Sequence, residues 1–238
     1  MSMVESHPDP EALGRLAAGF DHGFADPTLL VRAMQHRSWQ AEYDAPESNE
    51  RLEFLGDAVL GWVVADIAFT TFGELSEGRL TDLRKSVVNA KALASLARQV
   101  NLGPALLLGR GEDAAGGRTK TSILSDAFEA VIGAIYLDAG PTVAYEKVRR
   151  LLLPAMQRAL PNIDKFDAKT VLQERAARLG LSAPRYVVVS DGPDHARTFT
   201  ARVIVGDVEA LGAGASKKTA EQVAAEGALG RLSEPIDG

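Results

Sequence analysis

The chain has 238 residues, a formal net charge of −6 and a hydrophobic content of 46%, which is enough for an ordinary globular core in one large domain or two small ones. It has no cysteine, and this excludes disulfide frameworks, thiolate zinc sites and cysteine nucleophiles. The acidic balance is unusual for a protein that binds nucleic acid. No apolar run approaches the roughly 20 residues of a membrane span, and no signal peptide is recognisable at the N-terminus, so we expect a cytoplasmic chain without membrane contact.

The first two-thirds of the sequence is predicted to be helical. One helix is expected to begin at Asp26, a favourable N-cap residue, with Pro27 at the first helical position. A long helix from Ser48 to Phe72 is mostly apolar on all sides, a pattern typical of a central, buried helix. Further helices are expected over residues 76–103, with a break in the middle left open, and over residues 120–140 and 141–160. No segment here alternates with a period of two, so we predict an all-α domain over residues 10–158.

The character of the sequence changes near Leu160. Residues 159–167 are short, polar and rich in turn formers, which predicts a linker. Beyond them, a helix over residues 170–180 precedes β-like segments at 185–190, 198–206 and 207–215 and a last helix over 216–232. This α-β-β-β-α order predicts a small α+β domain over residues 168–235, with its helices on one face of a sheet.

Carboxylates occur in apolar helical surroundings at two places. In the segment "NERLEFLGD", Glu50, Glu53 and Asp57 share one helical face. Asp126 and Glu129 stand one turn apart in the apolar segment "SILSDAFEA". Burying carboxylates costs several kcal/mol unless they are paired or bind metal. Brought together, these acids would form an all-oxygen site suited to a hard divalent cation such as Mg²⁺.

A di-iron site and salt bridges to arginine are the two alternatives to a magnesium site. A ferritin-like di-iron site requires Glu-x-x-His, and no histidine stands at such a position after Glu50 or Asp126. Salt bridges to arginine remain open on the pattern alone. The candidate partners are Arg37, Arg51, Arg79 and Arg84.

The segment "NERLEFLGD" (residues 49–57) resembles the signature of bacterial ribonuclease III, an endonuclease of double-stranded RNA. The resemblance continues in the family's order through residues 35–39, 76–89, 107–117 and 122–138, and covers about residues 10–158. It implies metal ligands at Glu53, Asp126 and Glu129, catalytic roles for Asp57 and Glu129, outer acids at Glu50 and Glu77, and a subunit-interface position for Phe54.

The resemblance also implies what the protein acts on and with. The expected reaction is Mg²⁺-dependent hydrolysis of double-stranded RNA to 5′-phosphate products with short 3′ overhangs, with Mn²⁺ able to substitute and no small-molecule cofactor. The expected assembly is a homodimer, and the expected substrates are precursor ribosomal RNA and other RNAs that need processing. The alternative function is a double-stranded-RNA-binding protein that does not cleave.

The C-terminal unit resembles the double-stranded-RNA-binding domain of the same family. Lys217 and Lys218 stand in the first turn of the last helix, where the helix dipole disfavours cations. Two ammonium groups beside exposed backbone amides form a phosphate site, which explains the lysines better than stability does. The RNA-binding residues expected from the resemblance are Gln173, His195, Ser216, Lys217 and Lys218.

Two further features are predicted to be structural. The glycines of residues 109–117 follow a helix and lack the Gly-Lys-Ser/Thr ending of a phosphate-binding P-loop. His36 and Arg37 have no nucleophile paired with them, so we predict that they serve the fold.

Overall fold

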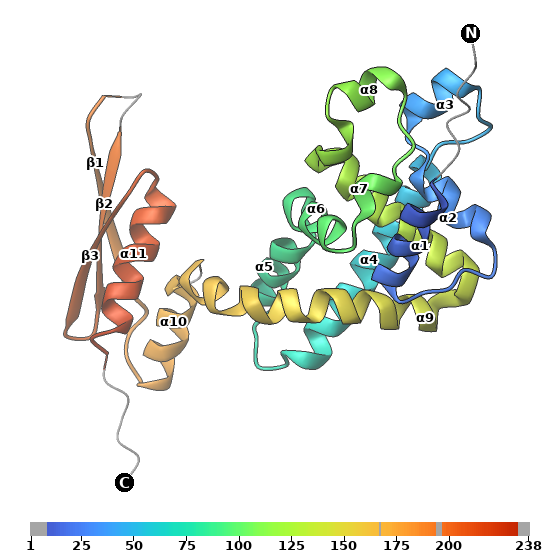
Figure 1. Ribbon diagram of the computed structural model, residues 1–238. Helices are drawn as coiled ribbons and strands as arrows, with labels where there is room; N and C mark the ends of the chain where they lie inside the picture. Colours follow the sequence, from blue (N-terminus) through green and yellow to red (C-terminus); the bar gives the residue numbers. More distant parts are fainter. Residues whose placement is uncertain (1–8, 167, 194–196, 233–238) are drawn as a thin grey trace. The chain divides into compact units, whose positions relative to one another are not determined.

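The computed structural model describes residues 9–166, 168–193 and 197–232 (Figure 1). The chain divides into two compact units, one up to Ala159 and one from Leu160 onward. His195, one of the predicted RNA contacts, lies outside the described residues. Within the described residues, no helix combines the length and the apolar character needed to cross a bilayer.

The first unit is helical, as predicted. Asp26 caps its second helix, and the carboxylate of Asp26 accepts a hydrogen bond from the Thr28 backbone N–H at 3.0 Å. The predicted helix over residues 76–103 is three helices. The Asn89 side chain accepts from the Ala92 N–H and starts the second, and Asn101, with φ 56°, directly precedes the third. The helices are α1 (Pro10–Phe20), α2 (Pro27–Met34), α3 (Arg37–Tyr43), α4 (Glu50–Thr71), α5 (Glu77–Val87), α6 (Ala90–Gln99), α7 (Leu102–Ala105), α8 (Arg110–Ala114), the 3₁₀ turn η1 (Gly117–Thr119) and α9 (Thr121–Phe166).

Helix α9 contains the helix boundary predicted at residue 140. Gly140 has φ 80° and ψ 179°, a conformation that interrupts the helical path and that glycine adopts without steric cost. The helix then resumes at Pro141 and continues to Phe166, so it includes all but the last residue of the segment 159–167 that was predicted as a linker.

Helices α4 and α9 form the centre of the first unit and contact each other backbone to backbone. A Cβ atom on Gly56 of α4 would lie 1.8 Å from the backbone oxygen of Glu129, and one on Gly133 of α9 would lie 2.3 Å from the backbone oxygen of Leu52. Only glycine fits at either position. The close crossing brings the helical turn that carries Glu53 against the turn that carries Glu129.

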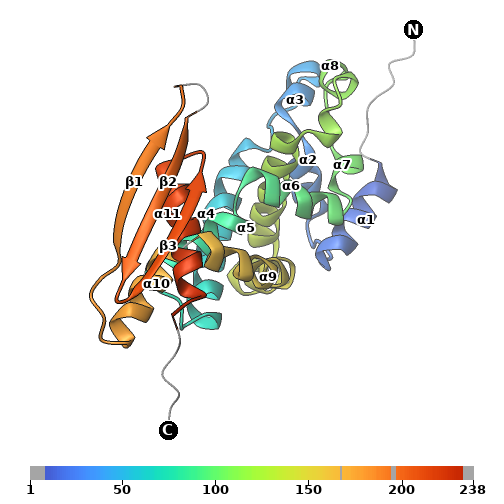
Figure 2. The same ribbon diagram turned by 90° about the vertical axis from the view of Figure 1, so that its left-hand side faces the viewer.

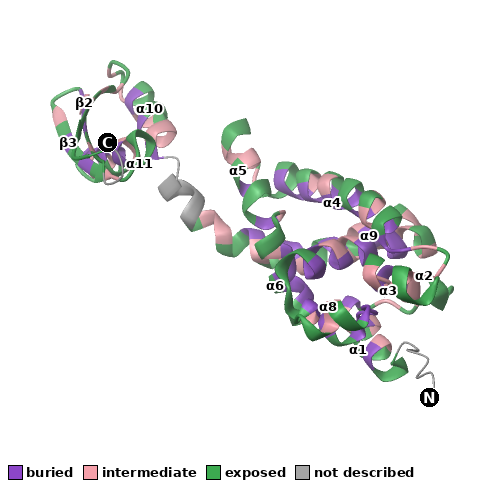
Figure 3. Ribbon diagram, turned by 90° about the horizontal axis from the view of Figure 1, so that it is seen from above, coloured by how far each residue is buried: buried purple, intermediate pink, exposed green. Residues whose placement is uncertain are grey.

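The prediction that α4 is buried on all sides is only partly correct. Leu60, Val63 and Ile67 are fully buried, and the purple segments of α4 and α9 in Figure 3 mark this core. On another face, however, Phe54 is 81% exposed and Phe69 is 73% exposed. Apolar composition identified the helix but could not show that one of its faces has no partner within the described chain.

The second unit has the predicted α-β-β-β-α order (Figure 2). Its three strands form an antiparallel sheet in the order in which they follow in the chain, with Val187 paired to Arg202 and Arg202 to Leu211. A Cβ on Gly212 would lie 2.2 Å from the Ala224 backbone nitrogen, so the last helix packs directly on the third strand. The elements are α10 (Ala168–Arg178), β1 (Arg185–Asp191), β2 (Thr198–Val205), β3 (Val208–Gly214) and α11 (Lys217–Leu229). The predicted fold class, an all-α domain followed by a small α+β domain, is confirmed.

Candidate active site

Three carboxylates from α4 and α9, those of Glu53, Asp126 and Glu129, converge to form an acidic cluster. One oxygen from each can be chosen so that all three lie within 4.8 Å of one another. All three side chains are half-buried. Glu53 comes from α4, while Asp126 and Glu129 are one turn apart on α9, so the helix crossing sets their spacing. An all-oxygen donor set of this kind fits a hard divalent cation.

The acidic cluster is electrostatically strained without a cation. Burial, together with the charges of Asp57, Glu53 and Asp126, raises the pKa of Glu129 to about 7. Burial and the neighbouring carboxylates also raise the pKa of Glu53, whereas Arg37 opposes this shift. A bound cation would relieve both effects because it favours the ionised carboxylates.

Salt bridges from Arg51 and Arg37 do not account for the acidic cluster. Arg51 points instead to Glu47, with 3.2 Å between Nη1 and Oε1. Arg37 lowers the pKa of Glu53 through the charge on its guanidinium, at a longer range than an ion pair. The convergence of like charges therefore remains the main feature of the site.

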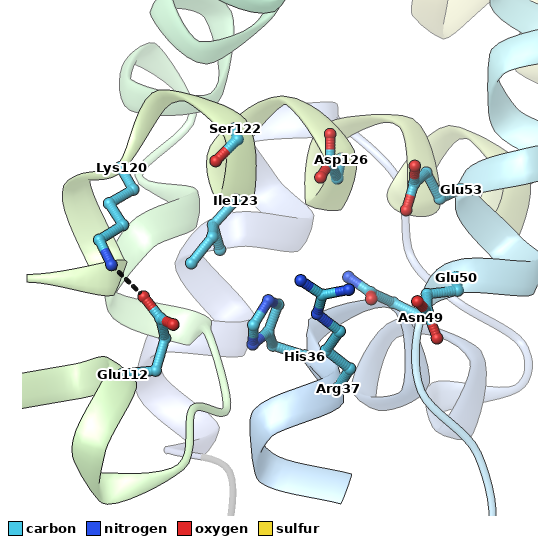
Figure 4. Close-up of a pocket in the computed structure, with 10 residues that line it drawn as sticks. All are labelled: His36, Arg37, Asn49, Glu50, Glu53, Glu112, Lys120, Ser122, Ile123 and Asp126. Carbon is cyan, nitrogen blue, oxygen red and sulfur yellow. Dashed lines mark hydrogen bonds and ion pairs between the residues drawn. The ribbon is translucent and has the colours of Figure 1, made fainter. Parts of the chain in front are cut away.

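A cavity of about 360 Å³ opens beside the acidic cluster (Figure 4). Glu53 and Asp126 line one part of it, and an ion pair between Glu112 and Lys120 lines another. Its remaining lining residues are His36, Arg37, Asn49, Glu50, Ser122 and Ile123. The cavity is therefore polar, and both acids and cations line it.

The remaining predicted acids lie at different distances from this cavity. Glu50 lines it, and its Oε2 accepts a hydrogen bond from Ser48 Oγ at 2.8 Å. Asp57 is exposed one turn after Glu53 and close enough to raise the pKa of Glu129. Glu77 is exposed at the start of α5, accepts a hydrogen bond from Thr81 at 3.2 Å, and is not among the residues that line the cavity.

Three charged residues that line the cavity were not predicted from the sequence to be part of the site. Glu112 and Lys120 lie in and after the glycine-containing segment that lacks the features of a nucleotide loop. Arg37 also lines the cavity, although its sequence context predicts a structural role. The sequence offered only an indirect indication for Lys120. This residue directly precedes the helix that carries Asp126, so its positive charge could have been expected near the acids.

A second, mostly apolar cavity of about 540 Å³ lies in the first unit and shares Glu50 with the polar one. Phe54 borders this cavity, and 81% of its surface is exposed. In the sequence Phe54 stands among the acids of "NERLEFLGD", but it does not line the polar cavity. The cavity is lined by Arg32, Glu50, Arg51, Leu52, Phe54, Leu55 and Leu137. An exposed aromatic ring beside an apolar hollow is typical of a protein interface.

The start of α11 is the candidate nucleic-acid interface of the second unit. Ser216 caps the helix, with its Oγ accepting from the Thr219 N–H at 3.1 Å. Lys217 and Lys218 follow in the first turn and are exposed. Gln173, the predicted contact on α10, is also exposed. Such a helix start offers backbone amides and two ammonium groups to a phosphate.

Comparison with known proteins identifies related chains for both units. A family model described as Ribonuclease-III-like matches residues 26–156, and one described as Double-stranded RNA binding motif matches residues 168–232. The chain is 51% identical over 213 residues to Ribonuclease 3 of Streptomyces coelicolor, covering 89% of this chain and 77% of that protein. It is 51% identical over 203 residues to Ribonuclease 3 of Thermobifida fusca, covering 85% of each. A solved nuclease domain of ribonuclease III from Campylobacter jejuni matches with a TM-score of 0.56 and 41% identity, over 63% of this chain and 99% of that one.

Proposed function

The chain belongs to the ribonuclease III family of double-stranded-RNA endonucleases, and from this premise we propose that Glu53, Asp126 and Glu129 hold Mg²⁺ for the hydrolysis. The observation that supports the ion site is the convergence of these three carboxylates within 4.8 Å. Mn²⁺ has the same preference for oxygen ligands and is expected to substitute. No small-molecule cofactor is required by this chemistry.

The proposed reaction uses the cation and the surrounding acids together. When bound, the cation polarises the phosphodiester and lowers the pKa of the attacking water. The carboxylate of Asp57, exposed beside the acidic cluster, accepts a proton from that water. Glu129 holds its ligand position only when ionised, because a protonated carboxyl cannot offer both oxygens to a cation. Glu50 and Glu77 are proposed as outer acids of the cleavage site.

The bond that breaks defines the products. The water oxygen bonds to phosphorus, the bond from phosphorus to the 3′ oxygen breaks, and the 3′ oxygen leaves as a hydroxyl after taking up a proton. The products are a 5′-phosphate and a 3′-hydroxyl. An empty acidic cluster would repel RNA, and a filled one would not, which reconciles the net charge of −6 with a nucleic-acid substrate.

We also propose a homodimer formed through the face that carries Phe54. The exposed ring stands beside a cavity of about 540 Å³, so two copies related by a two-fold axis could each place Phe54 in the hollow of the other. A two-fold dimer suits an antiparallel duplex because each active site meets one strand, which gives staggered cuts and short 3′ overhangs. Replacing Phe54 with Ala should shift the protein to monomer in sedimentation velocity.

The second unit is proposed to hold the duplex through Gln173, Ser216, Lys217 and Lys218, and through His195 in the segment outside the described residues. Domains of this kind read the shape, phosphates and 2′-hydroxyls of RNA over about 16 bp, with little preference for sequence. The proposed domain boundaries are residues 10–158 and 168–235 with residues 159–167 as linker. The proposed setting is cytoplasmic processing of ribosomal and messenger RNA precursors.

A duplex-cleavage assay tests the proposed ion and reaction. A labelled RNA duplex of about 40 bp is incubated with the protein in Mg²⁺, in Mn²⁺ and in EDTA. We expect cleavage with either cation and none with EDTA, and 5′-phosphate ends on the fragments. The variant Glu129→Ala should bind the duplex as the unmodified protein does but fail to cleave it. An intact duplex in Mg²⁺ would contradict the proposed reaction, and undiminished cleavage by Glu129→Ala would remove Glu129 from the site.

A further inference from the structure

Arg37 has a position in the active-site cavity that its predicted structural role does not explain. It is the first residue of α3, its side chain is exposed, and Figure 4 shows its guanidinium directed into the cavity. Across the part of the chain that the structure describes, the guanidinium has no hydrogen-bond or ion-pair partner. Its five N–H donors are therefore available to a ligand that enters the cavity.

The backbone that directly precedes Arg37 is held by hydrogen bonds to two other segments of the first unit. The His36 N–H donates to the Leu107 carbonyl at 3.1 Å, and the Gln35 carbonyl accepts from the Asn49 N–H at 2.8 Å. Asn49 directly precedes α4, the helix that carries Glu53. The root of the Arg37 side chain is therefore fixed relative to the acidic cluster, as substrate-positioning groups require.

The two cations that line the cavity differ in how far their charges are already compensated. Lys120 forms an ion pair with Glu112. Arg37 acts at a longer range, because its charge lowers the pKa of both Glu53 and Glu112 without a direct pair to either. Once a cation occupies the acidic cluster, the charge of Arg37 is left available for an anion.

His36 adds a neutral donor to the same wall of the cavity. Its Nδ1 accepts from the Ser38 backbone N–H at 3.2 Å, and Ser38 Oγ, which accepts from the Gly109 N–H at 3.0 Å, lies 2.8 Å from Nδ1. The neutral ring therefore carries its proton on Nε2. Burial lowers the pKa of His36, which favours this neutral form. Arg37 and His36 together present donors only.

We infer that Arg37 binds a phosphate of the RNA strand next to the bond that is cleaved, and so positions that bond at the acidic cluster. The ligand is a phosphodiester, whose two unbridged oxygens match the fork of the guanidinium. A cavity of about 360 Å³ that is lined by both the acids and Arg37 can accept a neighbouring phosphate while the scissile one meets the cation. The inference rests on the proposed function and adds to it a residue that holds substrate rather than metal.

The first test compares variants on an unmodified duplex in Mg²⁺. Arg37→Ala should lower kcat/KM by about 10- to 100-fold, the range for loss of a charge-assisted hydrogen bond. Arg37→Lys should recover part of the loss, because it keeps the charge but not the fork. The matched control is Arg15→Ala, which removes an exposed arginine paired with Glu11 on α1, and its kcat/KM should not change.

The second test separates phosphate binding from a general electrostatic role. Duplexes carry one uncharged methylphosphonate at either phosphate that flanks the scissile bond. At one of these positions the unmodified protein should lose about as much kcat/KM as Arg37→Ala loses on the normal duplex, and Arg37→Ala should lose no more than about twofold further. This non-additivity identifies the phosphate that Arg37 binds.

Two outcomes overturn the inference, and both differ from failure of the proposed function. If the unmodified protein cleaves and Arg37→Ala cleaves equally well, Arg37 does not bind the substrate. If Arg37→Ala is impaired to the same factor on every duplex, and the methylphosphonate effects add to it, Arg37 acts only as a counter-charge to the acids. Failure of the unmodified protein to cleave at all would instead contradict the proposed reaction.

Discussion

The acidic cluster of the first unit and the lysines at the start of α11 in the second are both proposed as charged sites for RNA, yet they are built differently. Glu53, Asp126 and Glu129 are half-buried and held by a crossing in which two helix backbones touch. Lys217 and Lys218 are exposed and stand at a capped helix end. Hydrolysis depends on fixed distances, whereas holding a duplex depends mainly on charge. Substitutions in the acidic cluster should therefore abolish cleavage abruptly, whereas substitutions at the lysines should weaken RNA binding gradually.

The largest effect is expected from Glu53→Gln, which keeps the shape of the side chain but removes its charge. Loss of a metal ligand should lower the cleavage rate by about a thousandfold, because the cation supplies several kcal/mol of transition-state stabilisation. The measurement is single-turnover cleavage in Mg²⁺. Glu146→Gln, at an exposed position of α9, is the matched control and should cleave normally. If the cleavage rate fell by less than tenfold, the acidic cluster would tolerate substitution as well as an exposed charged site does.

The next effect concerns the crossing itself. Gly56→Ala would place a Cβ 1.8 Å from the Glu129 carbonyl oxygen, so the helices must separate, and we expect about 3 kcal/mol of lost stability together with weaker Mg²⁺ binding. Gly14→Ala on α1 has open space around the added methyl group and should raise stability by roughly 0.5 to 1 kcal/mol. Urea denaturation measures both. If the two variants were equally stable, the backbone contact between α4 and α9 would not be what holds the acidic cluster together.

A smaller and graded effect is expected at α11. Replacing both Lys217 and Lys218 with Ala should weaken duplex binding by roughly 10- to 100-fold and reduce the salt dependence of log Kd by about one unit per lysine. Arg202→Ala removes a cation from the solvent-exposed face of the sheet, where it pairs with Glu209, and should leave the affinity unchanged. Binding titrations at several salt concentrations test this. An unchanged salt slope in the double variant would show that these lysines do not contact phosphates.

The smallest effect is a pH dependence of stability that arises at the acidic cluster. The pKa of Glu129 rises from an ordinary 4.5 to about 7, so without metal the folded protein retains a proton that the unfolded chain releases. Metal-free stability should therefore fall as the pH rises from 4.5 to 7, by about 1 to 2 kcal/mol after solvent screening of this half-buried group. Mg²⁺ affinity should rise over the same range. Denaturation in EDTA at about pH 5 and about pH 8 is the measurement, with Glu129→Gln expected to show a clearly smaller fall, because the raised pKa of Glu53 remains.

Much of this architecture could be predicted from local patterns. The cap at Asp26, the boundary at Gly140 and the α-β-β-β-α order all depend on residues near one another in the chain, and the structure contains each of them. The acids could be paired in advance because two apolar helices each carried carboxylates that needed a partner. Patterns of this kind predict where a single helix or strand begins and ends and which of its residues avoid solvent.

What could not be predicted depends on contacts between distant segments. From the sequence alone, Gly56 is only a residue of low helix propensity within a helix. Its requirement for glycine comes from the backbone carbonyl of Glu129 on another helix, which leaves no space for a Cβ atom. The exposure of Phe69 could not be predicted, since composition does not show which face of an apolar helix lacks a partner. The place of Arg37 in the cavity was missed because Asp126, which lines the same cavity, is far away in sequence.

The contact between Gly56 and Gly133 also determines how mechanically stiff the site is. Side chains that separate two helices can change rotamer and let the helices drift, but two backbones in contact have no such freedom. The backbone contact at the crossing therefore fixes the distance between Glu53 and Glu129 independently of the rest of the core. Core substitutions elsewhere in the first unit should consequently change how readily it unfolds, while the spacing of its carboxylates stays the same.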